Sequence, residues 1–193
     1  MRILKTNNEN PDKEVIEEAI KVMAHGGVVL YPTDTVYGLG VNIFNKKAVR
    51  RIYDIKKRSL MKPLSIIVSS KDAISHVANL RTRDKIYVDK FLPGPYTLIL
   101  NKTKIVPRVV TSGLKHVGVR IPDNEIACRI SDLFPVTTTS ANLSDHEVCE
   151  TPDEILDQLN HDVDLVIDVG KLKRNKPSTI INLTSEKPII LER

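Results

Sequence analysis

The chain has 193 residues, a formal net charge of +5 and 41% hydrophobic residues. This length suits one domain, and no apolar run reaches the length of a membrane span, so we expect a single cytoplasmic domain over residues 1–193 with no membrane partner. The positive charge favours an anionic partner such as a nucleotide or RNA, whereas 4% aromatic residues and no tryptophan argue against a platform that stacks single-stranded bases.

The predicted elements alternate between helices and short apolar strands. Asn10 and Pro11 predict the start of a helix that Gly26 and Gly27 end. The apolar run 28–31 predicts a strand buried on both faces, and the polar loop after it lies where α/β sheets commonly bind ligands. Further helices are expected at about 46–57, after residue 70, at about 82–92, from 124 and at 152–159. Further strands are expected at 64–68, 96–100, 116–121, 163–167, 178–183 and 188–191, and a strand that turns into a polar loop at 135–142.

Several connections between these elements are too short to cross over between parallel strands. The chain also shows no internal repeat and no low-complexity linker. We therefore expect an α/β fold in which a twisted sheet of mixed parallel and antiparallel strands is flanked by helices.

Four cations gather in residues 56–63, which we call the cation loop: Lys56, Lys57, Arg58 and Lys62. Helical spacing places Lys56 on the same face as the apolar residues before it. One interpretation is a snorkelling lysine with cations that complement the end of a helix. The other is a polyanion site, because converging cations can neutralise a triphosphate or a nucleic-acid backbone.

Two later segments carry polar groups that suit a ligand. Alternation in the predicted strand 116–121 places His116, Gly118 and Arg120 on one face, either as the wall of an anion or carboxylate site or as an ordinary half-exposed strand. Residues 137–142 offer four hydroxyls and an amide, either as hydrogen-bond donors to a ligand or as turn and cap chemistry.

The sequence excludes several common catalytic classes. It contains no phosphate-binding GxxxxGK[ST] loop and no GxGxxG unit between a strand and a helix, and its five histidines are dispersed without Ser-His-Asp or Cys-His arrangements. Cys128 and Cys149 lack the spacing of a zinc site, so we expect reduced thiols and no protein-bound metal. The remaining cations, hydroxyls and amide suit phosphate chemistry driven by positioning and charge neutralisation.

Six motifs occur in the order found in the YrdC-like family of threonylcarbamoyl-AMP synthases, which the chain resembles from about Pro11 to Arg193. They are YPTDTVYGLG at 31–40, KxR at 56–58 with KPL at 62–64, LPGPYT at 92–97, VRIP at 119–122, SAN at 140–142 and PSTI at 177–180. The resemblance implies a sheet with a large basic cavity. It also implies a nucleotidyltransferase that converts L-threonine, bicarbonate and ATP to threonylcarbamoyl-AMP and pyrophosphate.

The resemblance further implies the partners and the site. The adenylate would serve the formation of N6-threonylcarbamoyladenosine in tRNA, completed by a separate threonylcarbamoyl transferase, with Mg2+ carried by ATP. The matching catalytic positions are Lys56, Arg58, Ser140 and Asn142. The matching ATP positions are Arg58, Lys62, His116, Ser140 and Arg193. The matching threonine positions are Thr33, Arg120, Thr138 and Ser178.

This chain departs from the family pattern at two positions. Ile67 stands where many members carry a histidine, and Val148 stands where a serine that contacts the nucleotide is common. Two alternatives therefore stay open: a module that binds tRNA or double-stranded RNA without catalysis, and a paralogue that uses another acceptor. For Asp34, in the loop 32–40, we expect an Asx-turn that shapes the backbone.

Overall fold

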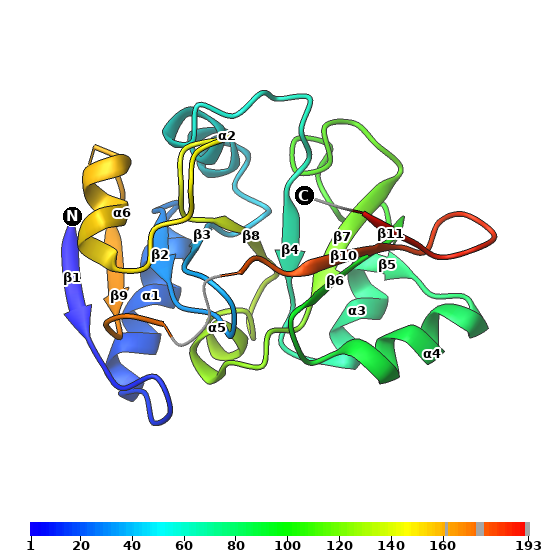
Figure 1. Ribbon diagram of the computed structural model, residues 1–193, viewed down its shortest axis with the longest axis horizontal. Coiled ribbons are helices and arrows are strands. Elements are labelled where there is room, and N and C mark those ends of the chain that lie inside the picture. The colour runs from blue at the N-terminus through cyan, green and yellow to red at the C-terminus, as the bar shows by residue number, and fades with distance from the viewer. Residues whose placement is uncertain (161, 173–175, 192–193) are drawn as a thin grey trace.

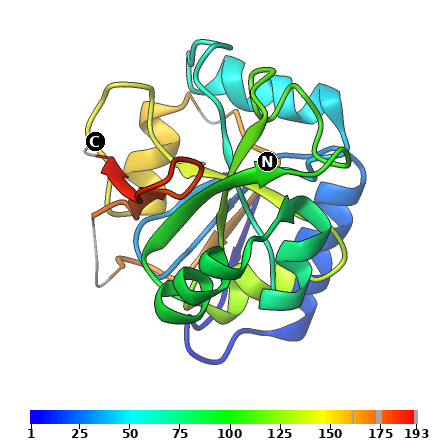
Figure 2. The same ribbon diagram turned by 90° about the vertical axis from the view of Figure 1, so that its right-hand side faces the viewer.

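The computed structural model describes residues 1–160, 162–172 and 176–191, and it contains one strongly twisted sheet (Figures 1 and 2). The strands run in the order β1-β9-β2-β3-β8-β4-β7-β6-β10-β11, and β5 pairs with β6. Their bounds are β1 (Arg2–Lys5), β2 (Val29–Tyr31), β3 (Gly38–Gly40), β4 (Ser65–Ile67), β5 (Ala78–Asn79), β6 (Tyr96–Lys102), β7 (His116–Arg120), β8 (Val136–Ser140), β9 (Leu165–Asp168), β10 (Thr179–Asn182) and β11 (Ile189–Leu191).

The sheet is mixed, as the short connections predict. Strands β1, β9 and β2 are parallel to their neighbours in that group, as are β4 with β7 and β6 with β10. The pairs β2–β3, β3–β8, β8–β4, β6–β7 and β10–β11 are antiparallel. The expectation of a mixed twisted sheet flanked by helices is therefore confirmed.

Helices cover both faces of the sheet. They are α1 (Lys13–Ala24), α2 (Lys46–Ile55), α3 (Lys71–Val77), α4 (Thr82–Phe91), α5 (Glu125–Ile130) and α6 (Pro152–Gln158). The apolar residues of α1 and α5 pack into one core cluster, and those of the other four helices pack into a second one. Adjacent residues of β4 separate the two clusters, since Ile66 belongs to one and Ile67 to the other. None of the helices that the structure describes is long and apolar enough for a membrane span.

Side-chain caps fix where most of the helices begin. The side chains of Asn45, Ser70, Asn124 and Thr151 each accept a hydrogen bond from a backbone N–H in the first turn of the helix that follows. Each such cap is worth about 1 kcal/mol. The first helix differs from the expected start at Asn10, because it begins after Asp12, whose carboxylate instead accepts a bond of 2.8 Å from the Thr6 hydroxyl.

Strand β3 was hidden in the sequence, because its two glycines and the polar residues before it are typical of a loop. Gly40 is required there by close packing, since an added Cβ would lie 2.6 Å from the Tyr31 ring and 2.7 Å from a methyl carbon of Val136. The ring of Tyr31 therefore lies over β3 from the neighbouring strand, with which it pairs. Its complete burial raises the pKa of Tyr31 to about 12.

Candidate active site

The candidate site begins on the sheet where the cluster under α1 and α5 ends. Ile67 of β4 and Val136 of β8 are register partners and belong to that apolar cluster. Two residues away along each strand, on the same face, lie Ser65 and Thr138, which are also register partners. The change from apolar to hydroxyl side chains at this point turns the sheet face from a core into the wall of a cavity.

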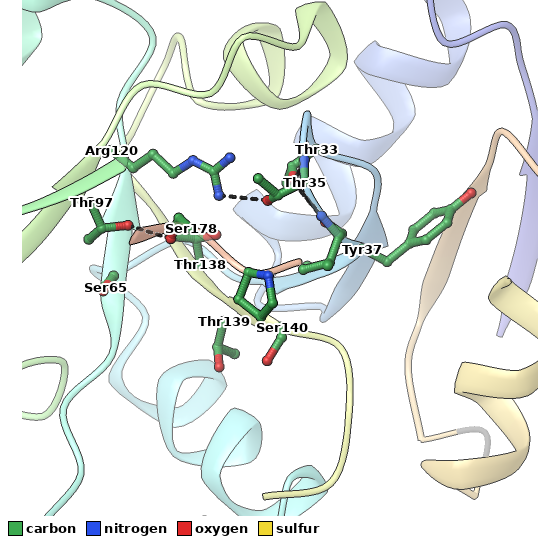
Figure 3. A pocket seen from close by; sticks show the side chains of 13 residues that line it. Thr33, Thr35, Tyr37, Ser65, Thr97, Arg120, Thr138, Thr139, Ser140 and Ser178 are labelled. Atoms are coloured by element: carbon green, nitrogen blue, oxygen red, sulfur yellow. Dashed lines mark hydrogen bonds between the residues drawn. The ribbon is translucent and has the colours of Figure 1, made fainter. Parts of the chain in front are cut away.

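This cavity, which we call the arginine cavity, has a volume of about 30 Å³. That space holds about two water molecules. Its walls come from the loop before β3, from β3, β8, β4, β7 and β6, and from the residues before β10. Figure 3 shows the hydroxyl side chains of these segments together with Arg120. The lining residues are Thr33, Thr35, Val36, Tyr37, Gly38, Ser65, Thr97, Arg120, Thr138, Thr139, Ser140, Pro177 and Ser178. All four predicted threonine positions are therefore brought together, while the large basic cavity that the resemblance implies stays a prediction.

Arg120, at the end of β7, is the cation of this cavity, and its residue is 4% exposed. Its Nε donates to the Gly94 carbonyl at 3.2 Å and its Nη1 donates to the Thr35 hydroxyl at 3.0 Å. Its Nη2 donates to the Asp34 carboxylate. Burial lowers the pKa of Arg120, and the charge of Asp34 opposes that shift. The guanidinium is thus held from three directions.

The expected Asx-turn at Asp34 is wrong. The turn is made by Thr33, whose hydroxyl oxygen accepts bonds from the backbone N–H groups of Thr35 at 3.1 Å and Val36 at 3.2 Å. Asp34 instead pairs with Arg120. Because a threonine hydroxyl already satisfies the turn, the carboxylate is free to reach a charge 86 residues further along the chain.

The site prediction left out several lining residues, including Thr35, which binds Arg120, and two hydroxyl residues on the strands. Thr97 of β6 lies 2.8 Å from Ser178, hydroxyl to hydroxyl, and Ser65 lies across from Gly118 of β7. A Cβ on Gly118 would come within 2.5 Å of the Ser65 hydroxyl and 3.1 Å of the Thr97 methyl group. Strand alternation could have placed Ser65 and Thr97 on this face, because every second side chain of a strand points to the same side of the sheet.

Lys56 is buried rather than exposed to a ligand, with 2% of the residue accessible. Its ammonium donates to the Ser140 carbonyl at 2.5 Å, to the Asn142 carbonyl, and to the Asn142 side-chain oxygen at 3.2 Å. The Ser140 hydroxyl donates to the same side-chain oxygen at 2.6 Å. Three of the four predicted catalytic residues therefore meet, but the lysine neither snorkels to water nor stands as a free cation.

Arg58 organises the cation loop from within. Its Nε donates to the Lys62 carbonyl at 3.1 Å and its Nη2 donates to the Pro63 carbonyl at 2.9 Å. Burial lowers the pKa of Arg58, although its charge stays useful because guanidinium groups remain protonated in proteins. The Lys62 ammonium lies at the surface, 3.1 Å from Asp145.

The remaining ATP positions are less closely grouped. His116 lies at the start of β7, two residues before Gly118 and thus on the face that borders the arginine cavity, but it is not among the lining residues. Arg193 lies outside the described residues. Ile67, at the position of the family histidine, is fully buried in the apolar cluster.

A buried arginine among hydroxyl side chains is an arrangement suited to a small carboxylate, and a loop rich in cations is suited to a polyanion. A family model described as telomere recombination, Sua5/YciO/YrdC, matches residues 21–193. The chain therefore belongs to the Sua5/YciO/YrdC family.

Relatives of known name support this membership. A Methanocaldococcus jannaschii protein, provisionally named threonylcarbamoyl-AMP synthase, is 45% identical over 182 residues, which are 94% of this chain and 86% of the relative. Escherichia coli YciO, named as uncharacterized, is 35% identical over 190 residues, which are 95% of this chain and 90% of the relative. The structure of Pyrococcus abyssi Sua5 complexed with L-threonine superposes with a TM-score of 0.93 at 33% identity, over 98% of this chain. This chain spans 56% of that Sua5 chain.

Proposed function

We propose that the protein is a threonylcarbamoyl-AMP synthase, which converts L-threonine, bicarbonate and ATP to threonylcarbamoyl-AMP and pyrophosphate. The observation that carries this proposal is the buried Arg120, fixed in a cavity whose other polar groups are almost all hydroxyls. The names of the relatives from Methanocaldococcus and Pyrococcus support it, as does the Sua5 complex with L-threonine.

L-threonine suits the arginine cavity in charge and in shape. Arg120 would bind the carboxylate with two parallel hydrogen bonds, the strongest arrangement available to a guanidinium. The hydroxyls of Thr33, Thr138 and Ser178 would bind the substrate's own hydroxyl and amine.

The chemistry would proceed in two steps. The threonine amine attacks carbon dioxide derived from bicarbonate and loses a proton, which gives a carbamate. A carbamate oxygen then attacks the α-phosphorus of ATP, and the bond from that phosphorus to the bridging oxygen breaks, releasing pyrophosphate. Arg58 and Lys62 would offset the charge of the leaving pyrophosphate, and such electrostatic positioning carries most of the rate in phosphate chemistry.

Lys56 would act in this reaction through other residues. Its ammonium is already bound by carbonyl and amide oxygens of Ser140 and Asn142, so its charge would hold that turn against the nucleotide instead of touching a phosphate. This assignment replaces the expectation that Lys56 itself neutralises the triphosphate.

Magnesium would accompany ATP. Among the residues that the structure describes, no group of three histidine, cysteine, aspartate or glutamate side chains could hold a metal ion. Mg2+ commonly keeps several waters and binds to substrate phosphates with few protein ligands, so this donor set fits a metal delivered by the nucleotide. Bound in that way, it would shield the charge of the phosphates.

The test is pyrophosphate release by the purified protein with ATP and Mg2+, with L-threonine and bicarbonate omitted in turn. We expect release only when both are present. We expect Arg58→Ala to lose this release while the protein stays folded, because Arg58 supplies charge and holds the cation loop. Release without threonine would contradict the proposal, and parental turnover in Arg58→Ala would remove Arg58 from the mechanism.

A second candidate, a paralogue with another acceptor, is favoured by Ile67. This side chain is fully buried against the cluster of Val136 and α5, so it offers no polar group where the family histidine would stand. The paralogue predicts ATP cleavage that is independent of threonine, which the same assay detects. Binding of tRNA or double-stranded RNA and transfer of the adenylate by a second enzyme remain proposals, and steep salt dependence of RNA affinity without turnover would instead favour a binding module.

A further inference from the structure

The ion pair between Asp34 and Arg120 adjoins the arginine cavity, because Arg120 belongs to both. The two side chains are 12% and 5% exposed, so both charges are largely removed from water. Arg120 lines the cavity, whereas Asp34 is not among the lining residues. Asp34 thus pairs with the arginine without forming part of the cavity lining.

The contacts of Arg120 leave a defined set of donors for a ligand. A guanidinium has five N–H groups. Within the described part of the chain, three of them have acceptors, one each on Nε, Nη1 and Nη2. The two that remain belong to the two terminal nitrogens, an arrangement that a carboxylate can accept with both of its oxygens.

Asp34 contributes the one charged acceptor among these three contacts. The carbonyl of Gly94 and the hydroxyl of Thr35 are neutral, and charge-assisted bonds are roughly twice as strong as neutral ones. The second carboxylate oxygen of Asp34 is buried without a partner among the described residues. Buried polar atoms are rarely left so, and the contact with Arg120 is therefore the one hydrogen bond that the Asp34 carboxylate makes among the described residues.

We infer that Asp34 is a positioning residue, which holds the Arg120 guanidinium so that its two remaining N–H groups receive the substrate carboxylate. The identity of that substrate as L-threonine rests on the proposed function. Asp34 also balances the charge of Arg120 before the ligand arrives, so the arginine stays in place in the ligand-free protein. It does not touch the substrate.

A matched control is available in the pair of Asp84 with Arg81. Asp84 is 1% exposed, and its two oxygens accept from the Arg81 side chain at 2.9 Å each, outside the arginine cavity. The change Asp84→Asn therefore removes a buried carboxylate that is paired with arginine and has no part in the site. It should lower stability and leave ligand binding unchanged.

The experiment has two arms, which use the full chain and the variants Asp34→Asn, Asp34→Leu and Asp84→Asn. The first arm measures hydrogen exchange at the Arg120 Nε–H by NMR without any ligand. The second measures L-threonine affinity by calorimetry and, where turnover is seen, KM for threonine against kcat. We expect Asp34→Asn to speed the exchange and to weaken threonine affinity by about tenfold each, with a larger loss in Asp34→Leu, which keeps no acceptor. A raised KM with little change in kcat would accompany this, because the carboxylate bond is made before the chemistry.

The outcomes separate this inference from the proposed function. Unchanged exchange at Arg120 in both Asp34 variants overturns the positioning role, whatever the substrate. Faster exchange with unchanged threonine affinity overturns the link to the carboxylate. Faster exchange in the Asp34 variants, together with a parent protein that binds no threonine, supports the positioning role and rejects the proposed substrate. Equal effects in Asp84→Asn would reduce the result to general destabilisation and overturn the inference.

Discussion

The arginine cavity and the cation loop differ in their balance of charge, although Ser65 of the cavity follows the loop closely in the sequence. In the cavity, one buried cation is matched by one buried carboxylate, and neutral hydroxyls supply the other polar contacts. In the cation loop, Lys62 lies 3.1 Å from the carboxylate of Asp145, whose charge also acts on Arg58. A balanced, enclosed site selects a ligand by shape and hydrogen bonding, whereas an exposed excess of positive charge attracts a polyanion with little selectivity.

The largest effect is expected from a substitution of Lys56, because this residue begins the cation loop and its ammonium binds Ser140, which lines the arginine cavity. We expect Lys56→Met to lower the free energy of unfolding by about 3 kcal/mol or more, since it leaves several buried oxygens without their charged donor. Urea denaturation followed by circular dichroism measures the loss. The neighbouring Lys57→Met, at an exposed residue, should change the same free energy by less than about 0.5 kcal/mol. Equal stability of Lys56→Met and the parent would show that the buried contacts are not needed.

Gly118→Ala tests the cavity alone. The new Cβ would lie 2.5 Å from the Ser65 hydroxyl, so the floor of the cavity has to shift. We expect L-threonine affinity to fall by about tenfold while ATP affinity stays the same, because a displaced wall disturbs shape without changing charge. Calorimetric titration with each ligand measures this.

A second substitution sharpens the Gly118 prediction. Ser65→Ala in the Gly118→Ala background removes the closest atom and leaves the Ser65 Cβ at 3.2 Å. Part of the threonine affinity should return. An unaffected affinity in the single variant would mean that the ligand lies elsewhere.

Salt should separate the two regions without any mutation. Raising NaCl from 50 to 500 mM should weaken ATP binding by about tenfold, because exposed charges are screened strongly at high ionic strength. Threonine binding should change by less than about twofold, because the Arg120–Asp34 pair is enclosed and balanced. Equal salt dependence of the two affinities would refute the electrostatic distinction.

The smallest effect is expected for the surface pair of Lys62 and Asp145, whose side chains are 51% and 80% exposed. Such pairs contribute about 0–1 kcal/mol, so Asp145→Asn should leave the melting temperature nearly unchanged. ATP affinity should rise by about twofold, because Lys62 loses a competing carboxylate. Weaker ATP binding in this variant would instead assign Asp145 a supporting role at the nucleotide.

Local patterns predicted much of the fold. Apolar runs and cap residues located most strands and helices, and Asn124 begins α5 as expected. Strand β3 escaped because glycine is typical of loops, and it is a strand only because Tyr31 packs over it. Cap geometry at Asp12 was set by Thr6, a side-chain contact that local spacing does not contain.

The site was predictable where a single strand or motif carries it. Arg120 and Gly118 share a face by alternation alone, and Thr33, Thr138 and Ser178, which the resemblance implies as threonine positions, line one cavity with Arg120. The partners of Asp34 and Lys56 were not predictable, because they lie more than 80 residues away and depend on how strands of distant sequence pair. Helical spacing did place Lys56 on the apolar face, but it could not show which oxygens meet the ammonium.

The double attachment of Lys56 to the turn after β8 has a mechanical consequence. Its side chain binds oxygens of Ser140 and Asn142, and its own carbonyl accepts a bond of 2.9 Å from the Ser144 N–H. These hydrogen bonds therefore fix the end of α2 to this turn. Ser140 also forms part of the cavity wall. A nucleotide that displaces the cation loop would strain the cavity wall that we propose binds threonine. Each ligand would then change the affinity for the other, by the same factor in both directions.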